Sequence, residues 1–152
     1  MEILILLGLI VLNGVFAMTE IALVTSRKAR LKKLATEGSR SAEVALNIAE
    51  DPTRFLSTIQ IGITSISILN GIIGEALFAA SVSVWLQGLG MSAGTAAIMA
   101  TSLVVVVVTY VSIVVGELVP KRLGQINPEP IACLVAIPMQ WLTFVARPFV
   151  AL

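Results

Sequence analysis

Three long apolar runs dominate the hydrophobic pattern of the chain, at about residues 3–25, 55–86 and 95–117. About 20 residues of α-helix cross a hydrocarbon core of roughly 30 Å, so each run is long enough to span a bilayer. The third run contains five consecutive valines, which in water would favour a strand. In lipid a helix is favoured instead, because it satisfies its own backbone hydrogen bonds. The pattern therefore predicts three transmembrane helices.

A fourth apolar stretch, at about residues 129–147, differs from the first three. It contains Pro138 and Gln140, and it carries Trp141 and Arg147, which are residue types typical of membrane interfaces. We expect a juxtamembrane helix that lies like a belt at the membrane surface or re-enters it. A fourth full crossing by residues 131–146 is the alternative.

The segment between the first two runs is basic and amphipathic. Within residues 27–50, apolar residues recur at helical spacing in two stretches, which Gly38 separates. The second stretch ends at Asp51 and Pro52, where a helix is disfavoured. We therefore expect two short cytosolic helices that pack against the membrane. The fold class predicted for the whole chain is an all-α membrane protein.

Composition supports the membrane assignment, and the distribution of charge predicts an orientation. Charged residues make up only 12% of the chain, about half the fraction found in soluble domains. Seven of the ten Lys and Arg residues lie within residues 26–54, whereas residues 87–94 contain none. The positive-inside rule predicts a multi-pass protein of the cell membrane, with the N-terminus outside and with residues 26–54 and the C-terminus in the cytosol. Anionic lipid explains this basic segment better than a nucleic acid does.

Polar residues interrupt the predicted spans, although such groups are costly in lipid. The first span places Asn13 and Glu20 on one helical face, and Asn70 borders a small-or-polar stripe on the second span. That stripe comprises Gln60, Thr64, Ser67, Gly71 and Gly74. Small and hydroxyl-bearing residues also let helices approach closely, so helix packing stays open as an alternative role. The roles of Glu20 and Glu75 stay open as well.

The segment 116–121, with the sequence GELVPK, has the chemistry of a cation site. Pro120 has no N–H, so the carbonyl of Gly116 loses its helical donor. A free backbone oxygen beside the Glu117 carboxylate offers hard ligands of the kind that Mg²⁺ and Ca²⁺ take, and Na⁺ would also fit. Unwound backbone of this kind lines ion sites in transporters. The chain has no histidine and shows no pairing of nucleophile and base, so we do not expect an enzyme.

Three motifs resemble the transmembrane domain of the CorC/cyclin-M (CNNM) family, in order and across essentially the whole chain. They are GELVPK at 116–121, FAMTEIAL at 16–23 and DPTRFLSTIQIGIT at 51–64. The resemblance implies a homodimeric Mg²⁺ transporter that exports Mg²⁺ coupled to Na⁺ entry. Members of the family normally continue into a cytosolic pair of CBS modules, so this chain would correspond to one transmembrane domain, residues 1–152, without that pair.

The resemblance also implies a Mg²⁺ site between the helices. Its residues would be Thr19, Ser67, Asn70, Gly116 and Glu117. Thr19 stands where the family usually has serine; it keeps the hydroxyl group and adds a methyl group. A membrane scaffold or Mg²⁺ sensor that modulates another protein, without transporting ions itself, is the alternative function.

Overall fold

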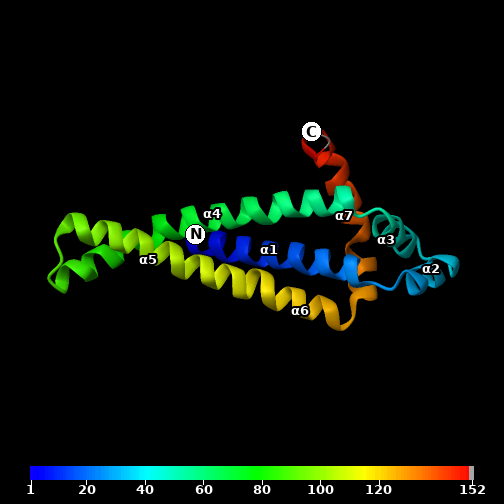
Figure 1. The fold of residues 1–152 in the computed structure, drawn as a ribbon, viewed down its shortest axis with the longest axis horizontal. Coiled ribbons are helices and arrows are strands. Elements are labelled where there is room, and N and C mark those ends of the chain that lie inside the picture. The colour runs from blue at the N-terminus through cyan, green and yellow to red at the C-terminus, as the bar shows by residue number, and fades with distance from the viewer. Residues whose placement is uncertain (151–152) are drawn as a thin grey trace.

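The computed structural model describes residues 1–150, and these form helices joined by short links, with no strand among them (Figure 1). The elements are α1 (Glu2–Thr25), α2 (Lys28–Thr36), α3 (Arg40–Glu50), α4 (Thr53–Gly88), α5 (Ala93–Ile113), the π-helical turn η1 (Val114–Leu118), α6 (Val119–Ile126) and α7 (Pro128–Val150).

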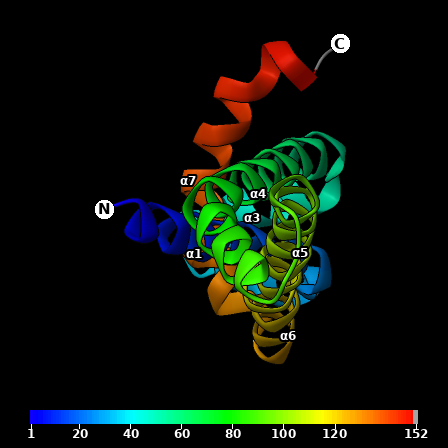
Figure 2. The same ribbon diagram turned by 90° about the vertical axis from the view of Figure 1, so that its left-hand side faces the viewer.

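The long helices form a bundle (Figures 1 and 2). α1 packs on α4 and on η1 and α6, and α4 packs on α5. Large apolar side chains cover the outside of the bundle; Leu4 and Ile98, for example, are each 71% exposed. An apolar outer surface of this extent is suited to lipid rather than to water. The chain is a multi-pass membrane protein.

The basic segment contains the two short helices expected from its periodicity. α2 stops before Gly38, whose φ of +99° is a conformation that glycine adopts readily. α3 then begins with an N-terminal cap, because the Ser39 hydroxyl accepts a hydrogen bond from the backbone N–H of Ala42 at 3.2 Å. Leu31 of α2 and Ala45 of α3 are fully buried in the core that also holds part of α7.

α7 runs across one end of the bundle rather than along it (Figure 1). It packs on α1, α3 and α4, and its inner face buries Ala132, Ala136 and Met139. Its outer face exposes Leu134 and Trp141. By length and composition alone, four helices including α7 could cross a membrane. The arrangement of three crossings with a belt helix stays a prediction, which the transverse direction of α7 supports.

The third long helix differs from our expectation. We expected it to end near residue 117 with unwound backbone before Pro120, but helix continues from α5 through η1 into α6. The reason is the π-turn, in which the N–H of Val119 donates to the carbonyl of Val114. In this wider turn a backbone N–H donates to the carbonyl five residues earlier instead of four. The helix can therefore continue past Pro120 without unwinding.

The close contact of α6 with α1 depends on Gly124, and this gives a first prediction. A Cβ atom at Gly124 would lie 2.5 Å from Cγ2 of Ile21 and 3.0 Å from the carbonyl oxygen of Met18. We expect Gly124→Ala to destabilise the protein by about 1–3 kcal/mol, because the helices would have to separate. Thermal unfolding in detergent measures the change. Gly94→Ala is the control, since a Cβ there meets nothing within 4 Å; equal melting temperatures for the two variants would contradict the prediction.

Candidate functional site

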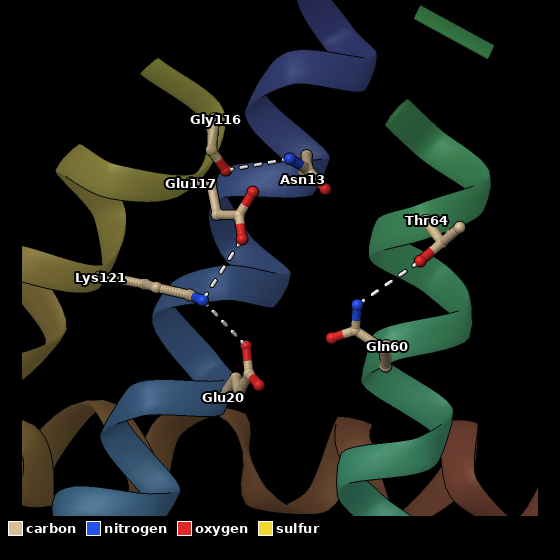
Figure 3. A network of polar contacts seen from close by, with 7 residues as sticks. All are labelled: Asn13, Glu20, Gln60, Thr64, Gly116, Glu117 and Lys121. Atoms are coloured by element: carbon tan, nitrogen blue, oxygen red, sulfur yellow. Dashed lines mark hydrogen bonds and ion pairs between the residues drawn. The ribbon is translucent and has the colours of Figure 1, made fainter. Parts of the chain in front are cut away.

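The carbonyl released by Pro120 contacts α1. The side-chain amide of Asn13 donates a hydrogen bond to the carbonyl oxygen of Gly116 at 3.2 Å, across 103 residues of sequence (Figure 3). Asn13 is 1% exposed, and its amide oxygen has no hydrogen-bond partner among the described residues. The contact therefore holds the π-turn against α1 and leaves a buried acceptor oxygen beside Gly116.

Two carboxylates lie next to this contact and share one ammonium group. Nζ of Lys121 is 3.3 Å from Oε1 of Glu117 and 3.5 Å from Oε2 of Glu20 (Figure 3). The first contact is also a hydrogen bond, whereas the second has only the distance of an ion pair. Two carboxylates around one ammonium leave a net negative charge. The protein thus already holds a cationic group at the junction of α1, η1 and α6.

A cavity of about 680 Å³, with both apolar and polar side chains in its lining, lies between α4 and the continuous helix of α5 and η1. Its charged lining groups are Glu75 and Glu117. Its neutral polar lining groups are Gln60, Thr64, Ser67, Thr109 and Ser112. Ser112 is buried, and its hydroxyl has no hydrogen-bond partner among the described residues. Hydroxyl, amide and carboxylate oxygens together suit a cation rather than an anion.

The residues of the stripe predicted on the second span have two different roles: some line the cavity, and one packs α4 against α5. Gly71 lines the cavity together with the polar residues that precede it on α4. Gly74 does not line it; a Cβ atom there would lie 2.7 Å from Cγ2 of Val108. Gly74 therefore serves the close packing of α4 on α5, the alternative that the sequence left open for it.

The five predicted site residues lie in different surroundings. Ser67 and Glu117 line the same cavity, and Gly116 precedes Glu117 with its carbonyl directed at Asn13. Asn70 is 1% exposed, does not line the cavity, and has no hydrogen-bond partner for either amide atom within the described residues. The Thr19 hydroxyl donates to the carbonyl of Val15 at 2.6 Å and is thus engaged within its own helix. Their assignment as ligands stays a prediction.

The predicted site did not include three residues of the network, Asn13, Glu20 and Lys121. A signal existed for each of them. Asn13 and Glu20 are seven residues apart, on one helical face, and Lys121 follows Glu117 by four residues, which places them on neighbouring turns. Within residues 1–150, no group of three or more Asp, Glu, Cys or His side chains is placed to hold a metal ion. Any ion bound here would need neutral oxygens in addition to carboxylate oxygens.

Sequence comparison identifies the family. The family described as "Cyclin M transmembrane N-terminal domain" matches residues 4–152. The chain belongs to this family. Among the relatives of this cyclin-M domain, UPF0053 protein sll0260 of Synechocystis is 45% identical over 100% of the chain and 34% of its own length. The Polyamine export protein of Escherichia coli is 38% identical over 98% of the chain and 33% of its own length.

A third relative, UPF0053 protein YhdT of Bacillus subtilis, is 32% identical over 97% of the chain and 32% of its own length. The chain thus spans about a third of the length of these curated relatives. These matches confirm the resemblance of the three motifs to the CorC/cyclin-M family.

Proposed function

We propose that this cyclin-M domain is the membrane part of a cation exporter, and that Mg²⁺ is the cation it exports, coupled to Na⁺ entry. The observation that carries the proposal is the Glu117 carboxylate, which lines the cavity between α4 and the helix of α5 and η1 and already pairs with the ammonium of Lys121. A carboxylate inside a predicted span is costly unless it is paired or serves an ion.

The donor set fits a hard cation. Glu117 and Ser67 line the cavity, and Asn13 and the Gly116 carbonyl are in contact with each other beside Glu117. Asn70, three residues after Ser67, contributes a buried amide that has no partner among the described residues. Mg²⁺ requires near-octahedral oxygen coordination at 2.0–2.1 Å. Binding would require the Lys121 ammonium to give up Glu117 and the amides to turn toward the ion. In this proposal the lysine ammonium pairs with both carboxylates when no ion is bound and compensates one of their two negative charges.

The proposal includes the orientation and assembly expected from the sequence. The basic segment 26–54 and the C-terminal end would face the cytosol, and the N-terminus would face outside. The domain would work as a homodimer, with a cytosolic CBS pair in the full-length protein. The location of the basic residues near the end of the bundle crossed by α7 supports this orientation.

A polyamine is a second candidate cargo, because the cavity carries carboxylates at two levels. Its α4 wall runs from Gln60 to Glu75, and fifteen residues of helix rise about 22 Å. Glu75 accepts a hydrogen bond from Thr101 at 3.5 Å, on α5, whereas Glu117 belongs to the π-turn that follows α5. A linear cation with several ammonium groups could contact the two carboxylates in turn as it passes along the cavity. A relative named Polyamine export protein makes this candidate worth testing.

Flux through the purified protein in liposomes tests both candidates. We expect Mg²⁺ to leave protein-containing vesicles faster than protein-free ones, and an inward Na⁺ gradient to accelerate it. Radiolabelled putrescine and spermidine are measured in parallel. Polyamine flux without Mg²⁺ flux would favour the second cargo. Absence of flux for every cation would favour the alternative of a non-transporting scaffold or Mg²⁺ sensor.

A further inference from the structure

A second pocket lies away from the proposed cation path, at the end of the bundle where α3, the start of α4 and α7 meet (Figure 1). Its volume is about 340 Å³, and its basic residues are Arg54 of α4 and Arg147 of α7. An adjoining pocket shares Gln140 and Phe144 with it and adds Arg40 of α3. Three arginines from three helices therefore line two adjoining pockets beside α7.

Within residues 1–150, salt bridges do not neutralise these arginines. Among the residues that the structure describes, the basic partners of ion pairs are Arg30 and Lys121, and the pocket arginines are not among them. Asp51 is the acidic residue in the lining. The same pocket contains two arginines, Arg54 and Arg147, and the adjoining pocket contains Arg40. The combined site therefore has a net positive charge. A positively charged cleft with unneutralised guanidinium groups favours an anion, and the forked donors of arginine match a phosphate group.

The remaining lining groups indicate what kind of phosphate fits. The neutral polar side chains of Asn47, Gln140 and Thr143 line the same pocket, and Phe55 and Phe144 give it an apolar wall. On the outer surface of α7, Trp141 is 68% exposed and Phe144 is 67% exposed. Tryptophan is enriched at the level of lipid headgroups, and Phe144 adds exposed apolar surface beside it. A soluble anion would gain nothing from this apolar surface, whereas the acyl chains of a lipid would.

We propose that this pocket, formed by α3, α4 and α7, binds the headgroup of one anionic phospholipid of the phosphatidylglycerol type. The phosphodiester would lie between Arg54 and Arg147. The glycerol hydroxyls would donate to Asp51 and bond to the neutral polar groups, which gives the carboxylate in the lining a partner. The acyl chains would follow the exposed apolar face of α7. The lipid would then join α7 to the start of α4 and hold α7 in place across the bundle. Basic pockets between helices bind anionic headgroups in this way.

Native mass spectrometry of the delipidated protein tests the proposal. The wild type is titrated with dioleoylphosphatidylglycerol and, separately, with dioleoylphosphatidylcholine, which has the same acyl chains. We expect one phosphatidylglycerol per chain to be retained preferentially, and Arg54→Gln/Arg147→Gln to bind it about tenfold more weakly, since two charge-assisted contacts are lost. The control is Lys32→Gln/Lys33→Gln, which removes the same charge from exposed positions of α2. Equal losses in the two double variants, or no preference for phosphatidylglycerol in the wild type, would overturn the proposal.

Two further measurements are needed. The first tests whether weaker lipid binding comes from a lost contact rather than from misfolding, and the second tests whether the pocket prefers a lipid headgroup to free phosphate. Arg147→Lys retains the charge but not the forked donor, so we expect binding between that of the wild type and that of the double variant. Wild-type affinity in Arg147→Lys would contradict the phosphate contact. Thermal unfolding with dihexanoylphosphatidylglycerol is compared with inorganic phosphate at the same concentration. Stabilisation by the lipid alone supports the proposal, whereas equal stabilisation by free phosphate would show that the pocket is not a lipid site.

Discussion

Glu117→Gln is expected to reduce Mg²⁺ flux through reconstituted protein by roughly 10- to 100-fold. The substitution keeps the shape of the side chain and removes the carboxylate that lines the cavity and directly follows Gly116 in the sequence. Interactions with a charged group contribute about 1.5–3 kcal/mol, and tenfold in an equilibrium constant corresponds to about 1.4 kcal/mol. A fluorescent Mg²⁺ indicator inside proteoliposomes measures the flux.

The same variant should lose the Mg²⁺-dependent rise in melting temperature, because an ion that binds the folded state stabilises it by mass action. Glu2→Gln is the control, since Glu2 is exposed at the start of α1 and carries the same charge.

Glu75→Gln distinguishes the two cargoes. A polyamine that contacts both carboxylates should need Glu75 as well as Glu117, whereas Mg²⁺ should need Glu117 far more. Wild-type Mg²⁺ flux and stabilisation in Glu117→Gln would remove this carboxylate from the site.

The sequence predicted the elements that depend on local chemistry. The effect of Pro120 on the carbonyl of Gly116 follows from the missing N–H, and the structure has that carbonyl accepting from a side chain. The identity of the donor did not follow, because Asn13 is 103 residues away and only packing brings the two together. The π-turn was missed for a related reason. Whether a chain unwinds or widens at proline depends on the helices around it.

The polar residues of the spans show a similar limit. Periodicity placed Ser67 and Gly74 on one stripe, yet Ser67 lines the cavity and Gly74 packs on Val108. Helical periodicity cannot distinguish the two positions, because their different surroundings depend on how α5 crosses α4. Thr19 shows the other kind of limit. A hydroxyl in a helix can bond to the carbonyl of its own preceding turn, and this hydroxyl does so. A motif match alone could not tell a ligand from such a bond.

Lys121→Met is expected to lower the Mg²⁺ concentration needed for half-maximal thermal stabilisation by about tenfold. In the wild type the lysine ammonium lies 3.3 Å from Glu117 and 3.5 Å from Glu20, so an arriving cation must displace it. Methionine has a similar length and no charge, and it leaves both carboxylates available. Without Mg²⁺ the variant should be less stable by about 1 kcal/mol, because these partly exposed ion pairs are lost. Added Mg²⁺ should restore that stability.

This pair of opposite effects separates a lysine that competes with the ion from one that only supports the fold. A supporting lysine would lower stability at every Mg²⁺ concentration and leave the midpoint unchanged. Titrations at constant ionic strength exclude general screening, and Arg122→Met is the matched control, because Arg122 is exposed and is not among the ion-paired residues of the described chain. Combining Lys121→Met with Glu117→Gln should abolish the gain in affinity, since the freed carboxylate is then absent. An undiminished gain in the double variant would mean that Glu117 is not the group that Lys121 protects.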